Sequence, residues 1–329
     1  PYASEVPGVM HACGHDVHTA SLVGAMLQLA EQPGSWSGTL IGVFQPAEEN
    51  GAGALAMLDD GLFDDTGLPD VVLGQHVTPA PVGQLICRPG WFLSAQRSWR
   101  VTVRGVGGHA SRPHLAKDAV VAAVAMVHRL QTVVAREVDP FRMAVLTVAT
   151  FHAGTKENVI PAEAVFTVSA RSYEPVVAER VRESLLRIVR GEAAAAGVDV
   201  EVEDVSEIPA CWNDPAENDR VAAALATVFG PDAVAPPRDP LPASDDFSRY
   251  AERLGVPSVI WNFGVQDPAL HAGPEPVPRN HDARFAPHPT DAVRVGMQGA
   301  LAVLRARLQP ELDTKQAAFE TSRVGVKPT

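Results

Sequence analysis

The first part of the chain alternates between helix-like and strand-like hydrophobic patterns. Apolar residues with helical spacing predict helices at residues 19–31 and 53–63. Short, nearly continuous apolar runs predict buried strands at residues 39–44 and 70–77. Alternation of this kind is typical of an α/β fold with a mostly parallel sheet and helices on its faces.

The pattern changes after about residue 95. Residues 98–106 alternate between apolar and polar side chains, as in a half-exposed strand. The elements predicted from there onward are a strand, a helix, two strands, a helix and a strand: 98–106, 116–138, 143–151, 164–170, 176–196 and 198–205. This order predicts a ferredoxin-like α+β unit, an antiparallel sheet covered by two helices.

The first style of pattern returns after Pro209. Helices are predicted at 217–229, 246–254 and 290–308, and a buried strand at 258–263. The simplest architecture is a discontinuous α/β domain made of residues 1–94 and 207–309. Residues 95–206 would form an inserted α+β domain, which could act in dimerisation or as a lid, and residues 310–329 a peripheral tail.

Composition and charge narrow the class of protein. The 329 residues include 39 acidic and 27 basic side chains, a formal net charge of -12, and no Lys/Arg cluster. This balance argues against a nucleic-acid or anionic-membrane partner. The longest apolar run, 119–127, is too short to cross a bilayer. With three widely spaced cysteines and no signal peptide at the first residue, we expect a cytoplasmic enzyme without disulfides.

One segment near the start combines a thiol with imidazoles. His11, Cys13, His15 and His18 stand within eight positions, just before the predicted helix. A thiolate and neutral imidazoles are ligands that zinc prefers. The alternative interpretation is a His-rich helix cap with a buried free cysteine.

Three further segments carry candidate ligands or acids. Glu48 and Glu49 directly follow the predicted strand 39–44, at the edge of a parallel sheet where α/β folds place ligands. One glutamate could bind metal while the other faces a metal-bound water, although acidic residues also favour helix N-termini for dipole reasons. His76 ends the predicted strand 70–77, and His281 follows the last buried strand. Each of these histidines is weak evidence alone.

The motifs become specific when their order is considered. HACGHDVHTA (11–20), FQPAEENGAGAL (44–55), the strand ending in His76, GGHASRPH (107–114), NVIPAEA (158–164) and HDARF (281–285) follow one another. This order resembles the metal-dependent amidohydrolases of the aminoacylase and carboxypeptidase clan. The nearest branch holds hippurate hydrolases, N-acyl-amino acid amidohydrolases and indole-acetyl-amino acid hydrolases. The resemblance covers residues 7–308.

The resemblance implies a dinuclear metal site, with Zn or Mn, or alternatively Co or Ni. Its ligands fall on Cys13, His15, Glu49, His76 and His281, and its catalytic carboxylate falls on Glu48. His109 matches a histidine of the inserted domain that touches the substrate carbonyl. Asn158 and Arg171 match substrate-contacting positions of the wider clan. The resemblance also implies a homodimer, formed through the inserted domain.

The implied chemistry is hydrolysis of an N-acyl amino acid. Two divalent ions can lower the pKa of a bridging water to about 7. Glu48 would take the water proton and return it to the leaving amine, while His109 would stabilise the oxyanion. His109 can reach the metals only if its unit swings over the cleft or a partner subunit supplies it. Arg171 could grip both oxygens of the substrate carboxylate.

Two departures from the family pattern leave alternatives open. The family carries an earlier strand and an Arg-Ala-Asp-Met-Asp-like motif, whereas this sequence starts just before the cysteine motif, so we expect that segment to be absent. The residues after Phe285 read Ala-Pro-His-Pro where the family has an acidic run. The alternative functions are a dipeptidase or carboxypeptidase of the same clan, and an inactive binding protein on this scaffold.

Overall fold

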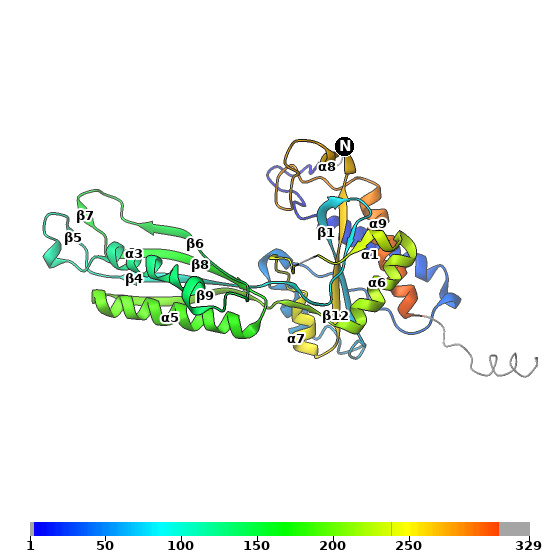
Figure 1. Ribbon diagram of the computed structural model, residues 1–329, viewed down its shortest axis with the longest axis horizontal. Coiled ribbons are helices and arrows are strands. Elements are labelled where there is room, and N and C mark those ends of the chain that lie inside the picture. Colours follow the sequence, from blue (N-terminus) through cyan, green and yellow to red (C-terminus); the bar gives the residue numbers. More distant parts are fainter. Residues whose placement is uncertain (1–2, 238, 309–329) are drawn as a thin grey trace, which may run out of the picture.

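The computed structural model describes residues 3–237 and 239–308; the predicted tail, 310–329, lies outside this part. Figure 1 shows two lobes side by side along the long axis of the molecule. One lobe holds a sheet with β1 and β12, and the other is an elongated layer of strands and helices. The chain runs from the first lobe into the second and back again, so that residues from both ends of the sequence build the first lobe.

The sheet of the first lobe has the strand order β1-β12-β2-β11. Its strands are β1 (Val72–Pro81), β12 (Ser258–Gln266), β2 (Leu85–Ile86) and β11 (Val234–Ala235). β1 pairs with β12 and β2 with β11 in parallel, whereas β12 and β2 are antiparallel. The predicted α/β class with a parallel sheet is confirmed.

The central strand β12 is buried along its whole length because both of its faces are covered. Val259, Trp261 and Phe263 belong to one apolar cluster, which includes residues of α1 (His15–Ala30), α6 (Pro215–Phe229) and α9 (Asp291–Arg307). Ile260 belongs to a second cluster, with Phe92 and Cys211. Since successive side chains of a strand point to opposite faces, an almost continuous apolar run is the sequence that such a strand requires.

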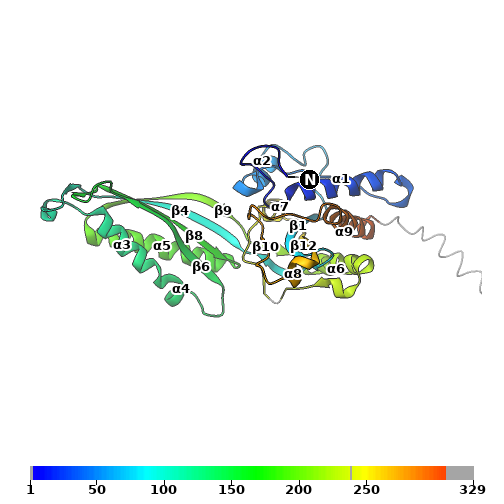
Figure 2. The ribbon, with the colours of Figure 1, turned by 90° about the horizontal axis from the view of Figure 1, so that it is seen from above.

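The second lobe contains an antiparallel sheet with the order β6-β8-β4-β9. Its strands are β4 (Ala95–Arg104), β6 (Ala144–Ala153), β8 (Glu163–Ser172) and β9 (Asp199–Ile208). The helices α3 (Ala119–Leu130), α4 (Thr132–Glu137) and α5 (Pro175–Ala196) lie on one side of this sheet (Figure 2). The elements follow the predicted order of strand, helix, two strands, helix and strand. The domain boundaries at 95 and 206 stay a prediction.

Short elements complete the part of the chain that the structure describes. They are η1 (Pro33–Ser35), η2 (Glu48–Asn50), α2 (Gly53–Asp59), β3 (Gly90–Leu93), β5 (Gly108–His109), η3 (Pro113–Leu115), β7 (Val159–Ile160), β10 (Cys211–Asn213), η4 (Pro231–Ala233), α7 (Ser248–Leu254) and α8 (Pro268–Ala272).

One predicted strand does not form. Residues 39–44 pair with no other strand among residues 3–237 and 239–308. Leu40 instead packs against a cluster that includes Leu29 of α1 and Leu301 of α9. At this position the apolar pattern therefore reflects packing against helices and not pairing within the sheet.

The predicted helix 116–138 is interrupted at Gln131. The side chain of Thr132 donates to the carbonyl of Arg129 at 2.8 Å, and that of Gln131 donates to the carbonyl of Val127 at 3.1 Å. Side-chain hydrogen bonds of this kind compete with the helical ladder. α3 ends before the break, and α4 begins after it.

The segment Ala119–Glu137 is long and apolar enough to cross a membrane by length and composition alone. The short length of the apolar run 119–127 therefore does not by itself exclude a membrane-spanning helix at this position. One face of α3, which includes Ala122, Met126 and Leu130, is buried in the core of the second lobe. The absence of a membrane partner stays a prediction.

Candidate metal centre

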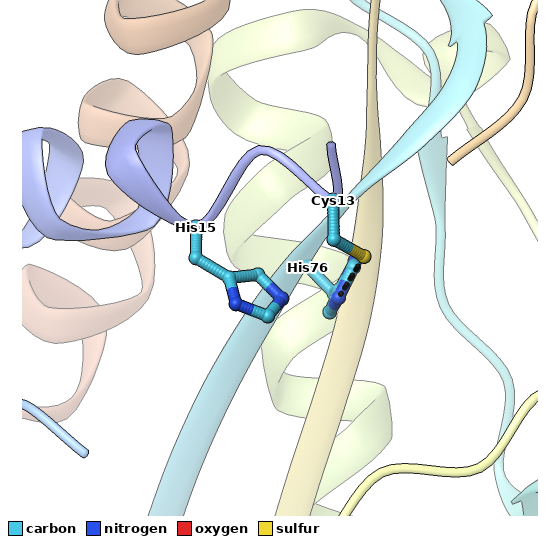
Figure 3. Close-up of side chains that lie close together, drawn as sticks. All are labelled: Cys13, His15 and His76. Atoms are coloured by element: carbon cyan, nitrogen blue, oxygen red, sulfur yellow. Dashed lines mark hydrogen bonds between the residues drawn. The ribbon is translucent and has the colours of Figure 1, made fainter. Parts of the chain in front are cut away.

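Cys13, His15 and His76 point toward one another at the start of α1 and on β1 (Figure 3). The Sγ atom of Cys13 lies 3.7 Å from Nε2 of His76. Gly14 makes this approach possible: its φ is 74°, and a Cβ at this position would lie 2.8 Å from a methyl group of Val77. The loop therefore passes so close to β1 that only glycine fits between Cys13 and His15.

His76 lies inside β1 and not at its end, because the strand continues to Pro81. Its Nδ1 atom lies 2.7 Å from the carbonyl oxygen of Val77. A carbonyl can only accept, so Nδ1 carries the proton and Nε2 keeps a free lone pair toward Cys13. The buried ring of His18 accepts from the backbone N–H of Val77 at 2.9 Å. The bond from Nδ1 to the Val77 carbonyl orients the ring of His76 as a metal-binding histidine requires.

His15 stands between the thiol and the two glutamates. Its Nε2 atom lies 3.6 Å from Oε2 of Glu48 and 4.0 Å from Oε1 of Glu49. This nitrogen is buried and has no hydrogen-bond partner in the described part of the chain. A buried nitrogen without a partner is costly unless another group takes up its lone pair or its proton.

His281 reaches the same place from the far end of the sequence. Its Nε2 atom lies 3.2 Å from Oε1 of Glu49, and its backbone N–H donates to the carbonyl of Ala12 at 2.8 Å. The φ of His281 is 71°, in the left-handed region, where only a few per cent of residues other than glycine are found. The preceding Asn280 donates a hydrogen bond to the Cys13 Sγ atom at 3.5 Å.

The five predicted ligands therefore converge, and we refer to Cys13, His15, Glu49, His76 and His281 as the donor cluster. Cys13 with His15 and His76, and Cys13 with Glu49 and His281, form groups whose ligand atoms lie within 4.8 Å of one another. One thiol, three imidazoles and a carboxylate are a suitable set for zinc and similar ions. Together with the unpartnered Nε2 of His15, this geometry fits bound divalent cations. The role of each residue as a ligand stays a prediction.

Burial shifts the pKa values of this site so that the neutral forms of its side chains are favoured. It raises the pKa of the Cys13 thiol to about 12 and lowers those of His15 and His76. Burial, followed by the nearby carboxylates of Asp245 and Glu49, raises the pKa of Glu48 to about 8. The metal-free site therefore disfavours the anions that a cation would stabilise.

Sequence reasoning missed Asp245 and Asp246. Both carboxylates are buried, and they form a group with Glu48 whose oxygens lie within 4.8 Å. Burial raises the pKa of Asp245 to about 6. Two adjacent acids at the start of the predicted helix 246–254 are a signal in the sequence, but such residues are also common helix caps. Only the fold brings them beside Glu48.

His109 and Asn158 are not near the donor cluster. They lie at the far end of the second lobe, where β5 pairs with β7 (Figure 1), and we call this end the β5–β7 tip. The exposed ring of His109 accepts hydrogen bonds at Nδ1 from the backbone N–H of Ser111 at 3.1 Å and from its hydroxyl at 2.8 Å. Because the backbone N–H can only donate, the proton of the neutral ring sits on Nε2.

Arg171 lies at the other end of the second sheet, next to the first lobe. Its Nη1 atom donates to the carbonyl of Pro242 at 2.9 Å and to the hydroxyl of Ser244 at 3.2 Å. The guanidinium thus supports the loop that leads to Asp245. The contact of Arg171 with a substrate carboxylate stays a prediction. Such a contact would use the guanidinium nitrogens other than Nη1.

Comparisons with known proteins identify the family of the chain. The model of peptidase family M20/M25/M40 matches residues 1–283. The chain belongs to this family. It is similar to an N-acetyl-L-cysteine deacetylase of Bacillus subtilis, 35% identical over 270 residues that cover 80% of this chain and 62% of the relative. It is also similar to an N-acetyldiaminopimelate deacetylase of Listeria monocytogenes, 35% identical over 77% of this chain and 67% of the relative.

A solved structure shares both the fold and the family. A dinuclear metal-binding peptidase of the M20 family from Bacillus subtilis superimposes with a TM-score of 0.73 and 27% sequence identity. The match covers 94% of this chain and 76% of that protein. The chain therefore spans less than the whole length of these relatives, and under two thirds of the N-acetyl-L-cysteine deacetylase.

Proposed function

We propose that the protein hydrolyses the amide bond of N-acyl amino acids with the help of two divalent cations. The observation that carries this proposal is the position of Glu48, whose carboxylate lies 3.6 Å from His15 and beside the donor cluster without belonging to its predicted ligands. Hydrolysis of an unactivated amide needs a nucleophilic water and a group that moves its proton. The donor cluster would hold the cations that bind the water, and Glu48 would move its proton.

The donor cluster would hold the two cations, Zn or Mn, or alternatively Co or Ni. When bound, such ions supply a water of low pKa and polarise the substrate carbonyl. Oε2 of Glu48 would accept the proton of the attacking water and pass it to the nitrogen of the leaving amino acid. Arg171 would contact the substrate carboxylate, whereas Asn158, which lies at the β5–β7 tip beside His109, would contact the substrate from a second copy of the chain.

We propose that His109 acts in the active site of a second copy of the chain. Its Nε2–H is a donor suited to the oxyanion of the tetrahedral state. The β5–β7 tip is the far end of the second lobe, whereas α1 and β1, which carry His15 and His76, lie in the first lobe (Figure 1), so a contact within one chain would need a large closure of the two lobes. β6, an exposed edge strand of the second sheet, offers unpaired backbone groups for a twofold dimer contact.

The proposed substrates are N-acyl amino acids with small or aromatic acyl groups. The two similar deacetylases act on N-acetylated amino acids by their names, and the sequence resemblance adds hippurate-like and indole-acetyl-like compounds. The protein, purified without metal, would be loaded with Zn²⁺ or Mn²⁺ and assayed for release of the free amino acid. The panel would hold N-acetyl, hippuryl and indole-acetyl amino acids and unblocked dipeptides.

We expect turnover of N-acyl amino acids that is lost in the presence of a chelator and returns when the metal is restored. Turnover of dipeptides alone would replace the proposal with a peptidase. Metal binding without turnover of any substrate would favour the inactive binding protein.

A further inference from the structure

We propose that Asp246 is a positioning residue, whose buried carboxylate clamps both ends of the loop that carries Glu48. The loop runs from Gln45 to Ala54 and contains the adjacent Glu48 and Glu49. The inference rests on the proposed function only for the role of Glu48. The clamp itself is a feature of the described fold.

The carboxylate of Asp246 makes one contact with each end of the loop. Its Oδ1 atom accepts a hydrogen bond from the side-chain Nε2 of Gln45 at 2.6 Å, and its Oδ2 atom accepts from the backbone N–H of Ala54 at 3.1 Å. Asp246 is fully buried. A buried carboxylate requires such partners, and bonds to a charged group are stronger than neutral ones.

Tyr250 of α7 completes the clamp on the first end. Its hydroxyl donates to Oε1 of Gln45 at 2.9 Å, and the residue is buried. The amide of Gln45 therefore donates to Asp246 and accepts from Tyr250, which defines its orientation. Both contacts come from one short segment of the chain, 201 and 205 positions away.

The loop has a conformation that needs such support. Ala47 has a φ of 55°, in the left-handed region that disfavours side chains with a Cβ. A Cβ at Gly53 would lie 1.6 Å from the carbonyl oxygen of Pro46, so the two ends of the loop are in close contact. Strained backbone persists where surrounding groups hold it in place. Asp246 is the side chain that bonds to both ends.

The clamp determines where the carboxylate of Glu48 stands. Glu48 follows directly after the strained Ala47, and its side chain faces His15 and Asp245. Release of either end of the loop would let Glu48 move away from these buried groups into solvent. The expected result is a poorly placed proton acceptor in a protein that still folds.

Hydrogen exchange tests the clamp without any measurement of activity. In Asp246→Asn only one acceptor oxygen remains, so the side chain can no longer accept hydrogen bonds from both Gln45 and Ala54. In Tyr250→Phe the bond to Gln45 is lost. We expect faster deuterium uptake in peptides that cover residues 45–54 in both variants, larger in Asp246→Asn. Uptake in the second sheet should not change. Unchanged uptake at residues 45–54 in both variants would overturn the inference.

Kinetics of metal-loaded enzyme test whether the clamp acts through Glu48. A buried bond to a charged group contributes about 1.5–3 kcal/mol, so Asp246→Asn should lower kcat by about 10- to 150-fold; Tyr250→Phe should lower it by about 2- to 13-fold. KM and metal content should stay close to those of the wild type. In a Glu48→Gln background, Asp246→Asn should have little further effect, because coupled residues are not additive. Equal losses in both backgrounds would show a merely structural role.

Glu252→Gln is the matched control, since Glu252 is an exposed acid of α7 whose carboxylate pairs with Arg249. It should leave both exchange and kcat unchanged. Failure of the proposed function is distinguishable: wild-type enzyme would then turn over no N-acyl amino acid, while the exchange of residues 45–54 would still respond to Asp246→Asn.

Discussion

His281 Nε2 lies 3.2 Å from Glu49 Oε1, although 232 positions separate the two residues in the sequence. The contact joins the loop before α9 to the loop after residues 39–44. Both side chains are more than half exposed, so the bond between them contributes little to stability by itself. Its significance is that two distant segments present a carboxylate and an imidazole to the same point in space.

The adjacent glutamates should differ in their effects. Glu49→Gln should lower metal occupancy, because it neutralises an anionic ligand. Glu48→Gln should keep both metals and lower kcat by about 10²- to 10⁴-fold, the usual range for a lost general base. Metal content by mass spectrometry and kcat of the loaded enzyme measure the two effects. Equal metal loss in both variants would show that the roles are misassigned.

Asn280→Ala should weaken metal binding while the metal-free protein keeps its fold. The side chain of Asn280 donates to the Sγ atom of Cys13, and loss of a bond to a ligand typically costs about 10- to 100-fold in affinity. Competition with a chelator of known affinity measures this change. Asp282→Asn, at a half-buried neighbour that pairs with Arg284, is the control. Equal affinities of Asn280→Ala and the wild type would contradict the assignment.

The contribution of Glu48 to the stability of the metal-free protein should fall as the pH rises. The pKa of Glu48 is raised from 4.5 to about 8 in the folded state, so the folded protein binds more protons than the unfolded chain between these values. The contribution of Glu48 to the free energy of unfolding then decreases with pH across this range. Glu48→Gln removes the effect. Urea unfolding with a chelator present should show an advantage of Glu48→Gln that disappears below about pH 4.5 and is largest above about pH 8. A pH-independent difference would refute this.

Mixed dimers should reveal whether His109 acts in trans. His109→Ala and Glu48→Gln each inactivate a different part of the proposed site. If subunits exchange, about half of the dimers in an equal mixture are mixed, and each mixed dimer contains one site with both residues intact. The activity of the mixture should therefore return toward a quarter of the wild-type value. No recovery despite proven exchange would leave only closure of the two lobes within one chain.

Much of the fold was predictable because it depends on local pattern. The run 258–263 predicted the buried strand β12, since both of its faces are covered by apolar clusters. The alternation in 98–106 predicted β4 of the second sheet. The error at 39–44 has the same origin: an apolar run indicates burial, whereas a strand also requires a paired neighbour, which the sequence pattern does not report.

From the sequence alone, the chemical identity of the site was determined: a thiol, imidazoles and paired glutamates in the order of one family. The tertiary structure decided where these groups stand. It brought His281 to Glu49, placed His109 at the far end of the second lobe, and bonded Asp246 to the loop of Glu48. Ligand type is a property of each residue, whereas distances between remote loops depend on how sheets and helices pack, and so they emerge only from the folded chain.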